Sequence, residues 1–221
     1  MLKRIILVAS LICFTAASFA QKYRAKLTTE YGTMVIQLSD KTPKHRDNFV
    51  KLAKDHFYDG LLFHRVIPGF MIQGGDPNSK NAKPGEMLGN GDVGYRIDAE
   101  FNPELYHRRG ALAAARDNNP AKASSGCQFY IVDGKKFNEE ELAGIQKANH
   151  QNYTNKQKEV YATEGGAPHL DGNYTVFGQV TKGLDIIDKI ANQPRNKMDR
   201  PDEDQKIIKI KIQKRILFFW K

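Results

Sequence analysis

The segment FHRVIPGFMIQGGD combines a cation, an amide and several large apolar side chains in a pattern typical of two short strands. Arg65 lies between strand-forming neighbours, where a guanidinium is costly to bury unless its donors are used. Side chains two apart in a strand share a face, so Met71 and Gln73 point to the same side. Gln128 and Tyr130 repeat this pairing further along the chain. Two strands thus each present an amide beside a large apolar side chain, although the same pattern is also typical of a barrel surface whose amides bond to loops.

The remaining motifs do not support cofactor or metal chemistry. The glycine-rich stretch at 89–91 lacks the lysine and the strand-to-helix context of a phosphate-binding loop. The six histidines include no pair at the spacing of metal ligands on a helix, and no Gly-x-Ser-x-Gly sequence is present. Cys127 lies in an apolar segment, which is typical of a packed and unreactive thiol. We therefore expect no cofactor and no metal ion.

The composition is that of a soluble globular protein. With 221 residues, of which 40% are hydrophobic and 27% charged, the chain can bury one sizeable core. These proportions exclude extensive disorder, a collagen-like fibre and a multi-span membrane protein. The two cysteines are too few for a disulfide-rich scaffold or a four-thiolate zinc site.

The first 20 residues have the pattern of a secretory signal peptide. Lys3 and Arg4 precede an apolar run at 5–19, and the sequence SFA at 18–20 offers small residues at the two positions that a signal peptidase recognises. The apolar run is shorter than the roughly 20 residues that span a bilayer, which favours cleavage over an N-terminal membrane anchor. We expect a mature domain of residues 21–221 that is exported, with the periplasm as its compartment.

The C-terminal segment is basic and then apolar. Between Gln205 and Lys221 there are six basic residues and no acidic one. A basic patch can bind nucleic acid or an anionic membrane, but an exported protein meets little nucleic acid. We interpret the charges as a solvated strand face, with membrane contact as the less favoured alternative and a monomer as the expected state. The tail at 215–221 contains ILFFW, which packs across the barrel or against the insertion, forms an interaction site, or is a poorly ordered end.

Alternation of apolar and polar residues predicts many short strands and few helices. Strands are expected at 23–38 as a hairpin, then at 61–67, 70–73, 95–97, 110–115, 128–132, 175–180 and 208–212. Thr42, as N-cap, and Pro43 begin a helix that continues to about Lys54, and 184–191 is a second helix. Because long helices do not alternate with the strands, the pattern favours a closed or nearly closed β-barrel over a doubly wound sheet.

Residues 135–167 interrupt this strand pattern. Asn138 is followed three residues later by Glu141, and Thr154 is followed by Gln157, and both spacings are typical of a helix start. We therefore predict two short helices inserted into a loop of the barrel. The insertion either tunes substrate choice or braces the fold.

Four stretches together resemble the cyclophilin family. The segment at 63–76 resembles the cyclophilin signature, and GALAAAR at 110–116, SGCQFYI at 125–131 and HLDGNYTVFG at 169–178 follow in the family's order. The resemblance extends from about residue 31 to residue 214, apart from the insertion. Within the family, the chain resembles the bacterial exported branch. It implies a peptidyl-prolyl cis-trans isomerase on a closed eight-stranded antiparallel β-barrel capped by two helices.

The resemblance also implies roles for individual residues. Arg65 matches the catalytic arginine, and His64 matches a neighbour with a supporting role. The wall of the proline pocket is matched by Phe70, Met71, Tyr130 and Leu170, with Tyr174 where many relatives have histidine. Residues lining the peptide groove are matched by Gln73, Ala115, Arg116 and Gln128. His169 stands where some relatives carry a tryptophan that contacts cyclosporin, and Tyr130 adds a hydroxyl where phenylalanine is usual.

These residue types suit rotation about an X–Pro bond. The amide has partial double-bond character, and rotation without a catalyst takes tens to hundreds of seconds. No covalent bond breaks, so catalysis needs only tighter binding of the twisted amide than of the planar one. The leading hypothesis is an isomerase for proline-containing segments of folding exported proteins. The alternative is a barrel that binds such segments without turnover.

Overall fold

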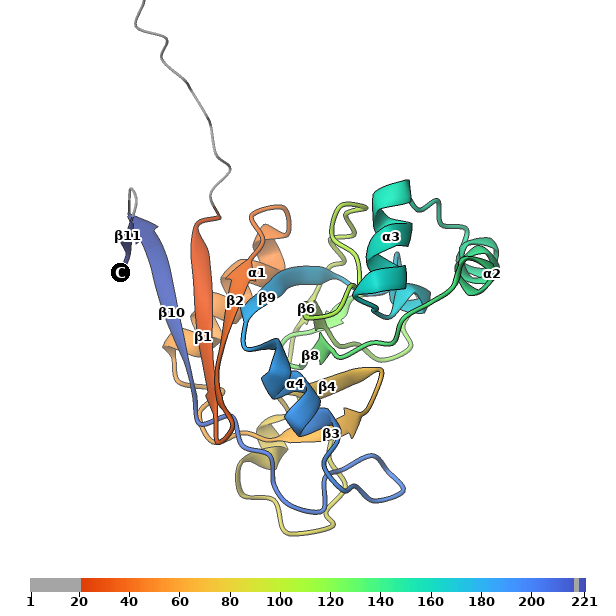
Figure 1. The fold of residues 1–221 in the computed structure, drawn as a ribbon. Helices are drawn as coiled ribbons and strands as arrows, with labels where there is room; N and C mark the ends of the chain where they lie inside the picture. The colour runs from red at the N-terminus through yellow and green to blue at the C-terminus, as the bar shows by residue number, and fades with distance from the viewer. Residues whose placement is uncertain (1–20, 217–218) are drawn as a thin grey trace, which may run out of the picture.

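The strands of this protein form one nine-stranded antiparallel sheet and one two-stranded ribbon (Figure 1). The computed structural model describes residues 21–216 and 219–221, so the predicted signal peptide and part of the C-terminal tail lie outside the described residues. In the large sheet the order is β11-β10-β1-β2-β9-β6-β8-β4-β3. Its strands are β1 (Tyr23–Thr29), β2 (Gly32–Leu38), β3 (Phe63–Ile67), β4 (Met71–Gly74), β6 (Ala111–Ala114), β8 (Phe129–Val132), β9 (Val176–Lys182), β10 (Lys209–Ile216) and β11 (Phe219–Trp220). The ribbon pairs β5 (Arg96–Ile97) with β7 (Ser124–Ser125).

The prediction of a closed eight-stranded barrel is not confirmed, because the end strands β3 and β11 do not pair with each other. Among the described residues, the segment before β3 contacts the segment before β10 through an isolated antiparallel bridge between Leu62 and Lys206 and a few backbone hydrogen bonds. Beside it, the N–H of Phe63 donates to the carbonyl of Gln205 at 2.8 Å. The chain then changes partner, and the N–H of Ile208 donates to β1 at Thr28. This change of partner limits the contact with β3 to a few bonds.

The main hydrophobic core lies between the inner face of the sheet and two helices, α1 (Pro43–Lys54) and α4 (Leu184–Ala191). Both helices were predicted, and each buries an apolar stripe against the sheet. At the centre of the core, the Phe49 ring of α1 meets the Phe129 ring of β8 edge-on, with 5.6 Å between ring centroids. Two helices therefore cover the inner face, as the sequence pattern predicts.

The start of α1 is capped differently from the prediction. Thr42 occupies the N-cap position, but its side chain makes no capping hydrogen bond. Glu100 takes this role: its carboxylate accepts from the N–H groups of Lys44 at 3.1 Å and of His45 at 3.0 Å. A carboxylate is favoured there because the first N–H groups of a helix have no partner within it.

The outer face of the sheet is also covered where β6, β8 and β4 lie side by side. All four residues of β6 and all four of β8 are buried, so these strands pack on both faces. A second cluster of apolar side chains forms on the outer face around Met71, Ala113 and Tyr130. The segment containing the short 3-10 helix η2 (Pro168–Leu170) contributes to this cluster.

The insertion contains the two predicted helices, α2 (Glu139–Asn149) and α3 (Asn155–Thr163). Both start with a capping box, Asn138 with Glu141 and Thr154 with Gln157, which confirms the signals in the sequence. The insertion has its own small core of Phe137, Leu142, Tyr153 and Tyr161. In Figure 1 it lies on the opposite side of the molecule from β10 and β11.

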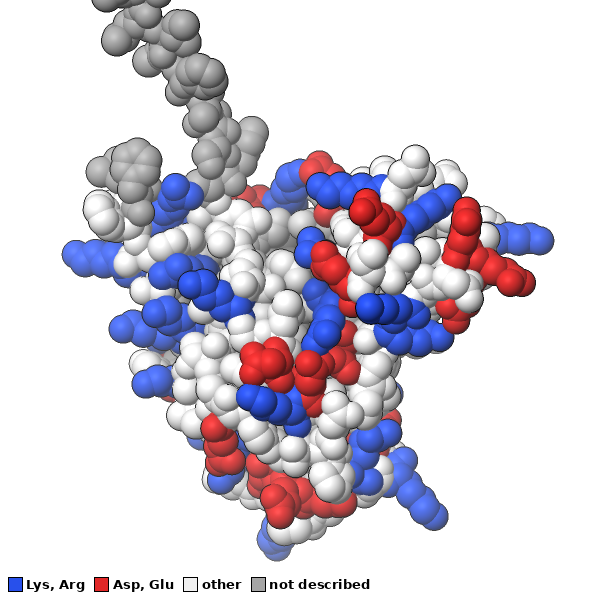
Figure 2. All heavy atoms as spheres, viewed as in Figure 1, with Lys and Arg blue, Asp and Glu red and all other residues white. Residues whose placement is uncertain are grey.

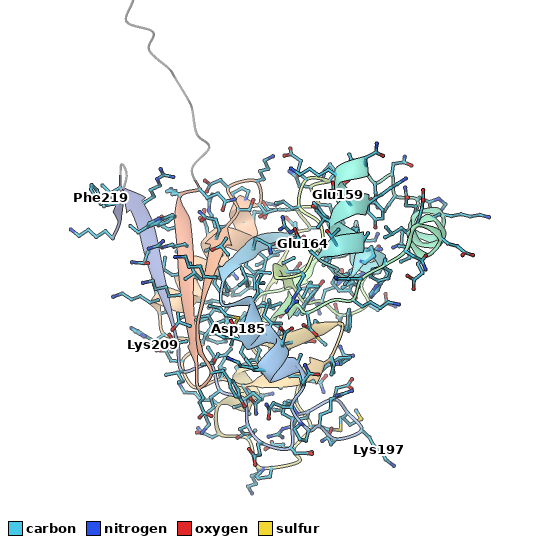
Figure 3. All side chains as sticks on the ribbon, in the orientation of Figure 1. Glu159, Glu164, Asp185, Lys197, Lys209 and Phe219 are labelled. Atoms are coloured by element: carbon cyan, nitrogen blue, oxygen red, sulfur yellow. The ribbon has the colours of Figure 1, made fainter. Side chains whose placement is uncertain are left out.

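The basic strand β10 faces solvent. Lys26 of β1 lies directly opposite Lys211 of β10, and lysine and arginine side chains project along this edge in Figure 2. Figure 3 places Lys209 and Phe219 at this edge, away from Glu159 and Glu164 of the insertion. Among residues 21–216 and 219–221, no helix has the length and apolar character needed to cross a membrane.

Candidate functional site

Strand register places four side chains in a row across the outer face of the sheet. Arg65 of β3 lies opposite Gln73 of β4, and Gln73 lies opposite Tyr130 of β8. Tyr130 in turn lies opposite Ala113 of β6. Directly opposed residues in neighbouring strands have side chains about 5 Å apart on the same face. The register therefore aligns the cation, one amide and the Tyr130 ring, although these residues are up to 65 positions apart in the chain.

A β-bulge at His64 sets the direction of Arg65. The register of β3 against β4 shifts between Phe63 and Arg65, so two steps on β3 match one step on β4. In a regular strand Phe63 and Arg65 would share a face. The extra residue lets the Phe63 ring enter the inner core while the Arg65 side chain points outward, with 42% of its side-chain surface exposed.

A cavity of about 110 Å³ opens beside Arg65. Nine of the twelve predicted site residues line it: Arg65, Phe70, Met71, Gln73, Ala115, Arg116, Tyr130, Leu170 and Tyr174. Phe70 and Met71 come from the turn into β4, Leu170 ends η2, and Tyr174 lies in the segment that follows. The cavity is thus lined by apolar and aromatic side chains together with two cations, Arg65 and Arg116, and one amide, Gln73.

The Arg65 guanidinium has one carboxylate neighbour. Its Nε lies 3.4 Å from Oδ2 of Asp199, whose other oxygen lies 3.5 Å from Nε of Arg195. Among the described residues, no hydrogen bond occupies the Nη1 and Nη2 groups of Arg65. Asp199 has a left-handed backbone with φ of 60°, and its carbonyl accepts from the N–H of Val66 at 2.8 Å. Asp199 therefore orients the arginine while leaving two donor groups for a ligand.

The two predicted amides are connected to each other rather than both free. Nε2 of Gln73 donates to Oε1 of Gln128 at 3.0 Å. Nε2 of Gln128 donates in turn to the carbonyls of Gly89 at 2.9 Å and Gly91 at 2.8 Å. The Gln128 amide thus holds the glycine-rich loop, which leaves Oε1 of Gln73 as the acceptor available to a peptide N–H.

A larger hollow of about 390 Å³ continues the site beyond Gln73. It shares Gln73, Ala115 and Arg116 with the first cavity and is closed on its far side by the 89–96 loop. Arg116 is fixed between the two: its Nε donates to the carbonyl of Asn173 at 2.9 Å, and its guanidinium carbon lies 4.7 Å from the centroid of the Tyr174 ring. The site is therefore a groove with one deep apolar end.

Two predicted residues, His64 and His169, do not line this groove. The His64 side chain is buried, and neither ring nitrogen has a hydrogen-bond partner. Burial lowers the pKa of His64 to about 4, so the ring is neutral. The His64 ring lies close to Gly89 of the glycine-rich loop. His169 lies at the rim, with its ring 5.3 Å from the Phe70 ring between centroids.

The hydroxyl of Tyr130 points away from the cavity into the protein. It lies 2.9 Å from Nε2 of His107, and burial raises the pKa of Tyr130 well above its usual value. Sequence reasoning missed His107, because one histidine in a loop carries no signal of its own. Asp171, which binds His107, stood in a quoted motif without an assigned role.

The described residues offer little for other chemistry. In residues 21–216 and 219–221, no three His, Cys, Asp or Glu side chains are grouped as metal ligands. Cys127 is buried, and burial raises its pKa to about 11, so the thiol is a poor nucleophile at neutral pH. The chemistry available at the site is binding of an apolar ring beside a fixed cation.

Comparison with known proteins assigns a family to this arrangement. The family model described as cyclophilin type peptidyl-prolyl cis-trans isomerase matches residues 24–212. A Staphylococcus saprophyticus protein described as a peptidyl-prolyl cis-trans isomerase is 36% identical over 185 residues, which is 83% of this chain and 88% of that protein. A Streptococcus pyogenes protein described as a bifunctional phosphatase and peptidyl-prolyl cis-trans isomerase is 37% identical over 86% of this chain, which spans only 38% of that longer protein.

Solved structures agree with the sequence comparison. The crystal structure of a Cryptosporidium parvum cyclophilin type peptidyl-prolyl cis-trans isomerase, determined in the presence of the dipeptide Ala-Pro, is 27% identical. It covers 85% of this chain and 96% of its own, with a TM-score of 0.63.

Proposed function

This chain belongs to the cyclophilin-type peptidyl-prolyl cis-trans isomerase family, and we propose that it uses Arg65 to speed X–Pro rotation in folding exported proteins. The observation that carries the proposal is the position of the Arg65 guanidinium at the edge of a socket formed by Phe70, Met71, Tyr130 and Leu170. A solved relative was crystallised in the presence of Ala-Pro, which supports a proline-containing peptide as the ligand here.

Arg65 stabilises the twisted amide, which is the state of highest free energy during rotation of the X–Pro bond. Twisting the amide removes its resonance, so the prolyl nitrogen gains a lone pair that can accept a hydrogen bond. A fixed, always-charged donor near that nitrogen stabilises the twisted state more than either planar isomer. The free Nη groups of Arg65 supply such a donor, since Asp199 contacts only its Nε.

The socket holds one side of the bond while the other side turns. The prolyl ring binds among apolar side chains, which exclude water and strengthen the nearby charge. Gln73 then accepts a hydrogen bond from the peptide backbone through its free Oε1, while Gln128 keeps the neighbouring loop in place. The shared hollow beyond Gln73 accommodates residues next to the proline.

The cellular setting is also a proposal. The sequence at 1–20 supports export through a cleavable signal peptide to the periplasm, and thus the bacterial exported branch of the family. The bonds that join residues 61–63 to 205–207 support a barrel that closes at this seam. We further propose a monomer whose basic strand β10 is solvated, with no nucleic-acid partner.

A protease-coupled assay with an X–Pro peptide tests the function. We expect the mature chain to raise the cis-to-trans rate in proportion to its concentration. The alternative, a barrel that only binds, predicts the spontaneous rate together with saturable binding of the same peptide. Turnover at the spontaneous rate would therefore overturn the catalytic proposal and leave the binding module.

A further inference from the structure

A chain of hydrogen bonds runs from the wall of the Arg65 cavity to helix α3 of the insertion. The Tyr130 hydroxyl lies 2.9 Å from Nε2 of His107, and Nδ1 of His107 lies 2.7 Å from Oδ1 of Asp171. The hydroxyl of Tyr161 on α3 donates to Oδ2 of Asp171 at 2.5 Å. All four residues are buried, with exposed fractions of 5% or less.

One tautomer of His107 satisfies every bond in this chain. With its hydrogen on Nδ1, the ring donates to the carboxylate oxygen of Asp171. The backbone N–H of His107 donates to the same oxygen at 2.8 Å. In this tautomer Nε2 of His107 is an acceptor, and the Tyr130 hydroxyl donates to it. The chain uses each of its buried hydroxyls and ring nitrogens, and ends at the Asp171 carboxylate.

The same residues contact the cavity wall through their rings and their place in the chain. The His107 and Tyr130 rings stack, with 6.0 Å between centroids and 14° between planes. The Tyr174 ring meets the Tyr130 ring edge-on at 6.0 Å. Asp171 lies in the short segment between Leu170 and Tyr174, two further wall residues.

The insertion holds the outer end of this chain. The Tyr161 ring is fully buried in the small core of the insertion, where it meets the Tyr106 ring at 5.5 Å and the Tyr153 ring at 5.3 Å. The N–H of Ala167, the last residue of the insertion, donates to the carbonyl of His107 at 2.7 Å. The insertion is thus bonded to the same two residues, His107 and Asp171, that support Tyr130.

We propose that His107, Asp171 and Tyr161 are positioning residues that hold the Tyr130 ring in the pocket wall, so that the insertion sets how tightly the prolyl ring is bound. The proposal rests on the isomerase function proposed above. No proton moves when an X–Pro bond rotates, so the chain acts by position and not as a relay. Because the wall touches the ring in planar and twisted states alike, we expect the effect in KM more than in kcat.

A double-mutant cycle tests the connection. Tyr161→Phe removes the outermost donor and keeps the ring; we expect kcat/KM to fall about three- to tenfold, the range for one lost hydrogen bond. In the Tyr130→Phe background the last link is already absent, so the same substitution should change kcat/KM by less than about 1.5-fold. Equal effects in the two backgrounds would overturn the proposal. Tyr106→Phe is the matched control, because its ring packs on Tyr161 outside the chain, and it should leave kcat/KM unchanged.

A spectroscopic measurement tests the direction of these bonds independently of the mutant cycle. In ¹⁵N-labelled wild-type protein, we expect His107 to show a protonated Nδ1 and an unprotonated Nε2, and Tyr130→Phe to shift the Nε2 signal. A protonated Nε2 in the wild type would refute the bond direction even where Tyr161→Phe does not fold. Wild-type turnover is measured in parallel. No turnover in the wild type would contradict the proposed isomerase function. Turnover together with equal effects of Tyr161→Phe in the two backgrounds would contradict only the positioning role.

Discussion

Replacing Arg65 with alanine is the sharpest test of the catalytic proposal. A hydrogen bond to a charged group contributes roughly 1.5–3 kcal/mol, and loss of one preorganised donor in an active site costs about 2.7–4 kcal/mol. Because 42% of the Arg65 side chain is exposed and Asp199 partly offsets its charge, the lower part of these ranges applies. We expect a loss of about 2–3 kcal/mol, which is about a 30- to 150-fold fall in kcat/KM.

The structure also says why this variant should fold. Arg65 lies on the outer face of the end strand β3, and its removal leaves Asp199 beside Arg195, with 3.5 Å between the paired atoms. Thermal unfolding should therefore be nearly unchanged. Arg65→Lys keeps the charge but loses the planar arrangement of donors, so it should fall between wild type and alanine.

Asp199→Asn is the matched control for the ion pair. Asparagine tolerates the left-handed backbone at this position and removes the charge that faces Nε of Arg65. We expect kcat/KM to stay within about threefold of wild type, because Asp199 orients the arginine without touching the ligand. The reasoning fails if a folded Arg65→Ala variant keeps its kcat/KM within threefold of the wild-type value in the protease-coupled assay.

Three further outcomes follow from buried groups near the site. The folded-state pKa of His64 is about 4 and its ordinary value is 6.5, so the stability contributed by the neutral ring is complete above about pH 6.5 and is lost as pH falls toward 4. In His64→Leu, the free energy of unfolding measured with urea should therefore fall by about 3 kcal/mol less than in the wild type between pH 6.5 and pH 4. The same fall in both proteins would contradict the assignment. Glu100→Ala should lower the free energy of unfolding by about 1–2 kcal/mol, since the first N–H groups of α1 lose their cap; an unchanged urea midpoint would contradict this. Gln73→Ala should lower kcat/KM about tenfold with little change in melting temperature. Gln128→Leu should lower the melting temperature, because two loop carbonyls lose their donor. The reverse pattern would assign ligand binding to Gln128 and the loop support to Gln73.

Features with local signals in the sequence were predicted well. The hairpin at 23–38, the helices at 43–54 and 184–191 and both capping boxes of the insertion depend on residues a few positions apart. Each of these signals combines a period of apolar residues with a start or turn residue, and both parts are visible in one short window.

Features that depend on distant partners were not predicted. Thr42 occupies the predicted N-cap position, but the carboxylate that accepts from the first N–H groups of α1 belongs to Glu100, more than 50 positions beyond the helix start. The change of partner near Ile207, which prevents a continuous ladder, depends on competition between β1 and the segment before β3. The pairing with β1 and the pairing with the segment before β3 are both made by backbone groups, so neither has a signal in the local sequence.

The candidate site divides in the same way. Residue identities came from motifs, and the cavity brings nine of those residues together. Alternation alone places His64 and Arg65 on opposite faces of the strand but does not say which of them faces the site. The bulge determines that the Arg65 side chain faces outward. The connection from Tyr130 through His107 to Asp171 joins three separate segments, so it was visible only in the fold.

The two halves of the site differ in how firmly they are held, and this difference predicts how their variants behave. Met71 and Tyr130 lie in the adjacent strands β4 and β8 and are almost fully buried, whereas Arg65 lies on an end strand and is half exposed. In the proposed mechanism, the buried wall binds the prolyl ring equally in every isomer, while the cation acts on the twisted amide alone.

Leu170→Ala tests this division, because Leu170 lines the socket but is only partly buried. We expect KM for an Ala-Pro peptide to rise about five- to tenfold, the scale of one to two kcal/mol of lost apolar contact, with kcat within about twofold. Arg65→Lys should show the opposite pattern, a fall in kcat with little change in KM. Exchange measurements by NMR on the peptide report both constants, and a fall in kcat for Leu170→Ala at unchanged KM would show that the socket takes part in stabilising the twisted bond.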